Sequence, residues 1–262
     1  MNWEKELFIS ENEKPLDRLV DGYSNTGIFR AIGFIGDSLS SGEFESRDGE
    51  GKPGYHDYYD YSWGQYIARK NGLTAYNFSR GGMTANEYME SFAEKQGFWN
   101  PALACQAYVI ALGVNDVINS GMEIGSVADI DPDDWHKNKP TFIGYYAQII
   151  ARIQSEIQPQ AKFFFVTMMH HDEDPVRDEK RRKHAEALYG LAKHFENAYV
   201  IDLYQYGPIY NDEYMKNYSL YGHLNPMGYI LTAKMVDSYI DYIIRKNPND
   251  FHRVPFIGKG LQ

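Results

Sequence analysis

Four segments of the chain contain residue types that are suited to acyl-transfer chemistry. Ser38 lies in "FIGDSLSSGE", Gly81 and Gly82 in "NFSRGGMTANEY", Asn115 in "IALGVNDVINSG" and His223 in "YSLYGHLNPMGY". A serine hydroxyl can act as a nucleophile and an imidazole as its general base. Backbone N–H groups and a side-chain amide can bind an oxyanion. These segments therefore supply the parts of a mechanism that proceeds through a serine ester.

Short apolar runs, alternating with helical patterns, are expected to position these residues. The runs have the length and the glycine or polar boundaries of buried strands, and they occupy 30–36, 74–79, 107–113, 162–169 and 197–203. The helical patterns occupy 61–72, 84–97, 141–157 and 174–195, and a last helix begins at Asn225 and Pro226. Asparagine is a good N-cap, and proline suits the first helical position.

Strands that alternate with helices predict an α/β fold, because parallel neighbours need crossover connections. In such sheets the functional site lies at the carboxyl ends of the strands. Ser38, the glycine pair and Asn115 each follow a predicted strand, so we expect them to meet at one edge of the sheet.

Each of these positions also has a purely local explanation. Asp37 or Ser38 can cap a helix, the glycine pair can form a plain turn, and Asn115 can close an Asx-turn. The combination favours a catalytic role for these residues, because three strand ends and a late histidine together supply nucleophile, oxyanion donors and base.

The four segments resemble sequence blocks of the SGNH (GDSL) hydrolases, over roughly residues 28 to 245. The resemblance implies Ser38 as nucleophile, His223 as base, and an oxyanion hole formed by the N–H groups of Ser38 and Gly82 with the amide of Asn115. In the second block it selects Gly82 over Gly81. The implied fold is a three-layer α/β/α sandwich around a five-stranded parallel sheet of flavodoxin-like topology. An α/β-hydrolase fold is disfavoured, because the G-x-S-x-G motif of that fold is absent around Ser38.

The resemblance fails at one position, three residues before His223. The family usually has an aspartate there, which orients the imidazole, whereas this chain has Leu220. Three interpretations stay open. A backbone carbonyl orients His223 in a Ser–His dyad, an acid from elsewhere takes the role (Asp212 and Glu213 being nearest in sequence), or most of the hydrolase activity has been lost.

Composition and charge limit the kinds of partner. The 262 residues are 43% hydrophobic and 24% charged, which suits a single SGNH hydrolase domain over 1–262 with an N-terminal extension at 1–27 and a tail at 246–262. A net charge of −10 argues against a nucleic-acid partner. The single cysteine, the lack of a signal-peptide pattern and the lack of a membrane span predict a cytoplasmic protein without a membrane partner.

Tyrosine-rich and aromatic segments are candidates for the rim of the pocket. A long loop is expected at "FESRDGEGKPGYHDYYDYSW", and a loop that leaves the nucleophile strand is well placed to border the site. Rim residues predicted from this loop and from two later ones are Tyr55, Tyr58, Tyr59, Trp135 and His170. The pair His170–His171 with Asp172 could also hold a metal, but no metal or cofactor is required by the predicted chemistry.

A polar, acidic, tyrosine-rich rim favours a small soluble ester, and O-acetylated carbohydrates are frequent substrates within the family. The leading hypothesis is therefore an esterase that removes acetyl groups from sugars or oligosaccharides. The alternatives are a lysophospholipase or acyl-thioesterase, which needs an apolar acyl groove, and an inactive carbohydrate-binding protein. The oligomeric state is left open.

Overall fold

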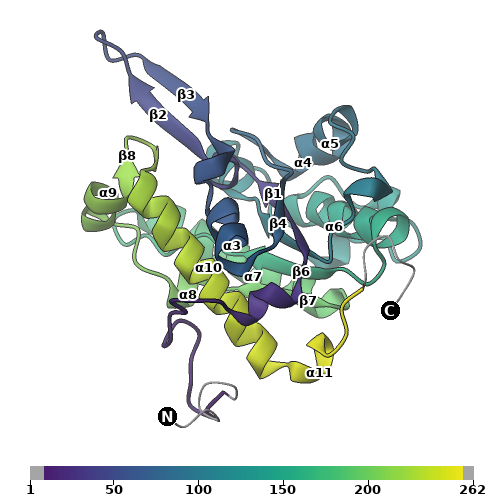
Figure 1. Cartoon of the computed structure of the whole chain (residues 1–262). Helices are drawn as coiled ribbons and strands as arrows, with labels where there is room; N and C mark the ends of the chain where they lie inside the picture. The colour runs from purple at the N-terminus through teal and green to yellow at the C-terminus, as the bar shows by residue number, and fades with distance from the viewer. Residues whose placement is uncertain (1–8, 256–262) are drawn as a thin grey trace, which may run out of the picture.

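The computed structural model describes residues 9–255, which form three layers around a parallel sheet (Figure 1). The sheet order is β4–β1–β5–β6–β7, so the second strand of the sheet in chain order lies at the edge and the first lies inside it. This is the flavodoxin-like order. The strands are β1 (Ala31–Gly36), β4 (Thr74–Asn77), β5 (Ala107–Ala111), β6 (Lys162–Val166) and β7 (Ala198–Ile201). The five predicted strands and the predicted fold class are confirmed.

Successive side chains of each strand point to opposite faces, and this alternation divides the core in two. Phe163 and Phe165 pack on the face covered by α6 and α7, whereas Phe164 packs on the face covered by α3 and α10. The larger helices are α3 (Trp63–Asn71), α6 (Phe142–Arg152), α7 (Pro175–His194), α9 (Asp212–Tyr218) and α10 (Pro226–Lys246). Shorter ones are α2 (Ser38–Ser41), α4 (Ala85–Glu87), α5 (Ala93–Lys95), α8 (Leu203–Tyr206) and α11 (Pro248–Phe251).

The segment that the sequence predicts as a long loop after the first strand is mostly a β-hairpin. It consists of β2 (Glu43–Arg47) and β3 (Pro53–Asp57) in antiparallel register, and it projects from the body of the molecule (Figure 1). Asp48 closes the turn, since its carboxylate accepts the backbone N–H groups of Glu50 and Lys52. The loop prediction was wrong because local turn chemistry at Asp48 pairs the flanking residues.

A second, much smaller hairpin precedes α10 and carries the late histidine. It pairs β8 (Ser219–Leu220) with β9 (His223–Leu224). Tyr221, in the turn between them, has a φ of 57°, in the left-handed region. No helix in the described part of the chain has the length and apolarity that a membrane span requires.

Candidate active site

A cavity of about 600 Å³ opens at the carboxyl ends of the strands, and Ser38, Gly82, Asn115 and His223 are among the residues that line it. The structure therefore brings together all four of the residues that the sequence predicts for catalysis. Two come from the ends of β1 and β5, one from the loop after β4, and one from β9. This convergence follows from the parallel order of the sheet, in which all strand ends face the same edge.

Ser38 is the first residue of α2, and Asp37 caps that short helix. The Asp37 carboxylate accepts the backbone N–H of Leu39 at 3.1 Å. Burial raises the pKa of Asp37 to about 6, against the lowering effect of this hydrogen bond. Asp37 thus caps the helix, as the local explanation of this segment predicts, and the cap holds Ser38 at the mouth of the cavity.

The candidate oxyanion donors lie on two neighbouring loops. Gly82 has a φ of 72°, a conformation that favours glycine. The Asn115 amide donates one hydrogen bond to the Met83 carbonyl at 3.2 Å, so the second of its two N–H bonds is available for a ligand. The Asn115 carbonyl oxygen accepts from the Asn119 amide at 2.9 Å, which fixes the amide's orientation. Asn119 is not among the residues predicted from the sequence, although its four-residue spacing from Asn115 on a helical turn is a usable signal.

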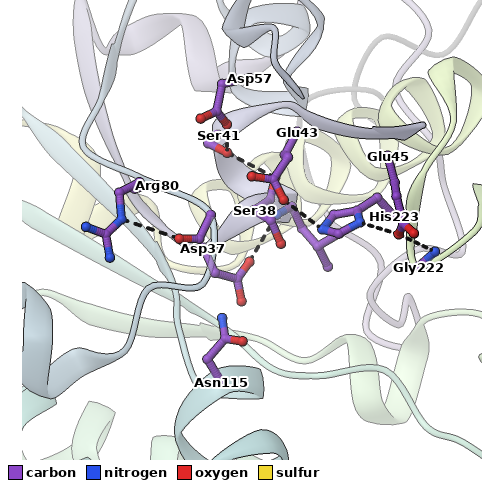
Figure 2. A network of polar contacts seen from close by, with 12 residues as sticks. Asp37, Ser38, Ser41, Glu43, Glu45, Asp57, Arg80, Asn115, Gly222 and His223 are labelled. Carbon is purple, nitrogen blue, oxygen red and sulfur yellow. Dashed lines mark hydrogen bonds and ion pairs between the residues drawn. The ribbon is translucent and has the colours of Figure 1, made fainter. Parts of the chain in front are cut away.

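His223 is oriented by a buried carboxylate that the sequence analysis did not select. Its Nδ1 lies 3.1 Å from Oε2 of Glu45, whose side chain is only 4% exposed (Figure 2). The same Oε2 accepts the backbone N–H of Gly222 at 2.9 Å, and Arg47 forms an ion pair with the other oxygen. Burial alone would raise the pKa of Glu45, but the Gly222 N–H, His223 and Arg47 hold it below the ordinary value. Glu45 is therefore a charged acceptor for Nδ1–H.

A second carboxylate contacts the other ring nitrogen. Oε1 of Glu43 lies 3.0 Å from Nε2 of His223, so the imidazole is placed between two acidic side chains of the same strand (Figure 2). Burial raises the pKa of Glu43; the charge of His223 opposes this effect, while Asp57 and Glu45 add to it.

Comparison with known proteins identifies the family of the chain. The family described as GDSL-like Lipase/Acylhydrolase matches residues 34–231, which is most of the chain. The chain belongs to this family. A search of curated proteins found no match.

Solved structures with the same fold share little sequence with this GDSL-like protein. A protein from Lactobacillus plantarum aligns with a TM-score of 0.61 and 16% identity, over 82% of this chain and 97% of that one. A family two carbohydrate esterase from Clostridium thermocellum, in complex with cellohexaose, aligns with a TM-score of 0.57 and 16% identity, over 91% of this chain and 66% of that one. A carbohydrate acetylesterase from Sinorhizobium meliloti aligns with a TM-score of 0.52 and 14% identity, over 82% of this chain and 99% of that one. The protein is an ester hydrolase of the GDSL type.

The acids predicted from the sequence lie away from His223 in this GDSL hydrolase. Asp212 and Glu213 form the first turn of α9, where the Asp212 backbone N–H donates to Glu173. Leu220 pairs with His223 across the small hairpin, and its side chain is 43% exposed. The position facing Nδ1 is occupied by Glu45, which reaches it from a hairpin 178 residues earlier.

Only one of the five predicted rim residues lines the cavity. Tyr55 does so, and its ring stands edge-on to His223 with centroids 5.6 Å apart. The others lie elsewhere: Tyr58 packs against Phe44, the hydroxyl of Tyr59 is buried, Trp135 stacks on His136 and His170 pairs with Asp178. Among the residues that the structure describes, no group of three or more His, Cys, Asp or Glu side chains could hold a metal.

The inner wall of the cavity is apolar. Side chains of α10, α8 and the loop that follows β6 form it, among them Met235, Val236, Leu203 and Met169. This wall is the part of the cavity that an acyl chain would contact.

Proposed function

We propose that this protein is a serine esterase in which Ser38, His223 and Glu45 act as nucleophile, base and acid. The observation that carries the proposal is the 3.1 Å contact between Nδ1 of His223 and the buried carboxylate of Glu45. A carboxylate at Nδ1 keeps the ring proton there, presents the Nε2 lone pair to the serine, and stabilises the imidazolium that forms.

The reaction begins when Ser38 Oγ attacks the ester carbonyl carbon and its proton passes to Nε2 of His223. The resulting oxyanion accepts hydrogen bonds from the backbone N–H groups of Ser38 and Gly82 and from the Asn115 amide. His223 then protonates the leaving alcohol, and an acyl-serine remains. Water, deprotonated by His223, hydrolyses this ester and restores Ser38.

The proposed substrate is a short-chain ester, with acetyl as the acyl group and a carbohydrate as the alcohol. The polar mouth around Ser38 and Tyr55 supports this assignment, as do the carbohydrate esterases among proteins of the same fold. The apolar inner wall at Met235 and Val236 favours a second candidate, hydrolysis of esters or thioesters with longer acyl chains. The sequence features discussed above favour the cytoplasm as the proposed location.

Two experiments test the proposal. A fluorophosphonate probe is expected to label the wild type and leave Ser38→Ala unlabelled; equal labelling of the two would exclude Ser38 as the nucleophile. A series of p-nitrophenyl esters then separates the two candidates. Maximal kcat/KM at acetate supports the short-chain assignment, and a maximum beyond about eight carbons supports the second candidate, because each buried CH₂ contributes about 0.8 kcal/mol.

A further inference from the structure

Glu43 has no role in the mechanism proposed above, yet it is in contact with the catalytic base. Glu43 and Glu45 are two residues apart on β2, so both side chains point to the same face of the hairpin. One carboxylate therefore faces Nδ1 of His223, and the other lies 3.0 Å from Nε2. The Glu43 side chain is about 12% exposed, and it lines the cavity.

One oxygen of Glu43 is free to receive a ligand. Oε1 contacts His223, while Oε2 lies above the backbone of Gly81, where a Cβ would come within 2.1 Å of it. Glycine at position 81 thus makes room for this carboxylate. None of the residues described by the structure donates a hydrogen bond to Oε2. The other carboxylate that lines the cavity, Asp37, already accepts the Leu39 N–H.

The mechanism of ester cleavage determines which part of the substrate would approach Oε2 of Glu43. Nε2 of His223 must give its proton to the departing alcohol oxygen, which therefore lies within about 3.2 Å of Nε2 during that step. Because Glu43 Oε1 lies 3.0 Å from the same nitrogen, the alcohol half of the substrate passes beside this carboxylate. A hydroxyl on the carbon adjacent to the one that bears the ester oxygen would then be within reach of Oε2.

We infer that Glu43 is a specificity-determining residue that selects esters of polyhydroxylated alcohols by accepting a hydrogen bond from a hydroxyl adjacent to the ester. The inference rests on the proposed function, since it assigns the alcohol side of the same site. Hydrogen bonds to an ionised acceptor are about twice as strong as neutral ones. An alcohol without such a hydroxyl leaves the carboxylate partly desolvated and without a donor.

The test compares two acetate esters that differ only in the group that is proposed to contact Glu43. In 2-hydroxyethyl acetate a hydroxyl takes the place of the terminal methyl group of propyl acetate. The ratio of their kcat/KM values is measured for the wild type, Glu43→Gln and Glu43→Met. We expect the wild type to prefer the hydroxyl ester. The ratio should fall at least about threefold in Glu43→Gln, which keeps a neutral acceptor, and at least about tenfold in Glu43→Met.

A control variant and three further outcomes complete the test. Glu50→Gln removes the same charge from the exposed hairpin turn and should leave the ratio at the wild-type value. An unchanged ratio in both Glu43 variants overturns the inference. Equal losses of about 10³-fold in kcat/KM on both esters also overturn it, because they would show that Glu43, like Glu45, supports His223 as the base. If the wild type hydrolyses neither ester and Ser38 is not labelled, the proposed function itself fails, and the inference with it.

Discussion

At the scale of single residues, the site depends on which carboxylate orients His223. Glu45 is fixed by three partners, namely the Gly222 N–H, Arg47 and the imidazole itself. Arg47 also lies over the ring of Tyr221, at 5.0 Å, and so connects the acid to the turn that carries the base. Glu45 thus orients the imidazole ring, and a carboxylate at Nδ1 favours the tautomer that carries its proton on that nitrogen.

Glu45→Gln is expected to lower kcat for p-nitrophenyl acetate by about 10³- to 10⁴-fold while the fold is retained, because an amide favours the wrong tautomer of the base. Asp212→Asn serves as the matched control and should keep wild-type kcat, since Asp212 lies on α9 away from His223. Steady-state kinetics with circular dichroism of all three proteins checks this. A larger loss in Asp212→Asn than in Glu45→Gln would contradict the assignment of the acid.

Asn119 is expected to act as a positioning residue for the oxyanion donor. Without its hydrogen bond, the Asn115 amide can rotate its N–H group away from the oxyanion. Asn119→Ala should therefore lower kcat by up to about tenfold with KM nearly unchanged, against about 10²- to 10³-fold for Asn115→Ala. Kinetics of the two variants measures this order. A change confined to KM in Asn119→Ala would argue against the role.

The candidate site could be predicted from the sequence only where the signal is local. Ser38, Gly82 and Asn115 each follow an apolar run that ends at the sheet edge, and His223 precedes an evident helix start. Glu45 has no such signal, since its contact with His223 spans 178 positions and depends on how a hairpin folds back. Asp212 and Glu213 are candidate acids only because they are near His223 in sequence, whereas tertiary packing places Glu45 at Nδ1.

At the scale of elements, the segments that carry the proposed oxyanion donors Gly82 and Asn115 are connected through Asp116. Its Oδ1 accepts the backbone N–H of Ala85, at the start of α4, at 2.8 Å. Its Oδ2 is buried without a partner among the described residues. Burial raises the pKa of Asp116 from an ordinary 3.8 to about 6, against the Ala85 N–H, which lowers it. The Ala85 hydrogen bond thus favours the ionised carboxylate, whereas burial favours the protonated one and has the larger effect.

This difference in pKa predicts a pH dependence of stability. Between about pH 4 and pH 6 the folded protein binds the Asp116 proton more tightly than the unfolded chain does, so this contribution to the free energy of unfolding is lost as pH rises through that window. Asp116→Asn does not titrate. The stability of the variant relative to the wild type should therefore rise by about 2 to 3 kcal/mol from pH 4 to pH 7.

Urea unfolding of both proteins at several pH values measures that difference. Asp37, whose pKa is also near 6, is present in both proteins, so most of its contribution cancels in the comparison. A stability difference that is constant with pH would show that the pKa of Asp116 is the same in the folded and the unfolded protein.

At the scale of the whole molecule, a buried polar network joins the N-terminal segment to α3 and α10. Asp237 of α10 forms an ion pair with Lys70 at 2.9 Å and accepts hydrogen bonds from Ser24 and Asn71. Ser24, Asn71 and Asp237 are all buried. The N-terminal segment around Ser24 is therefore part of the packed structure.

Asp237→Ala is expected to lower the free energy of unfolding by about 2 to 4 kcal/mol, because it leaves two buried polar groups and one cation without their acceptor. Thermal and urea unfolding measure the loss, with Glu50→Gln as an exposed control expected within about 0.5 kcal/mol of the wild type. The folded variant should keep its esterase kcat, since Asp237 is not among the residues that line the cavity. A loss below 1 kcal/mol would argue that the network contributes little.

The distance along the chain between the hairpin and its histidine has a consequence for synthesis. The nucleophile and both carboxylates lie within residues 38–45, whereas the base lies at 223, near the start of α10. A nascent chain therefore carries Ser38, Glu43 and Glu45 before His223 has been synthesised. Proton transfer to Nε2 becomes possible only when residues 219–224 have docked on the hairpin. Esterase activity thus requires that synthesis has passed residues 219–224, and a stalled ribosomal complex that ends before residue 219 should show none.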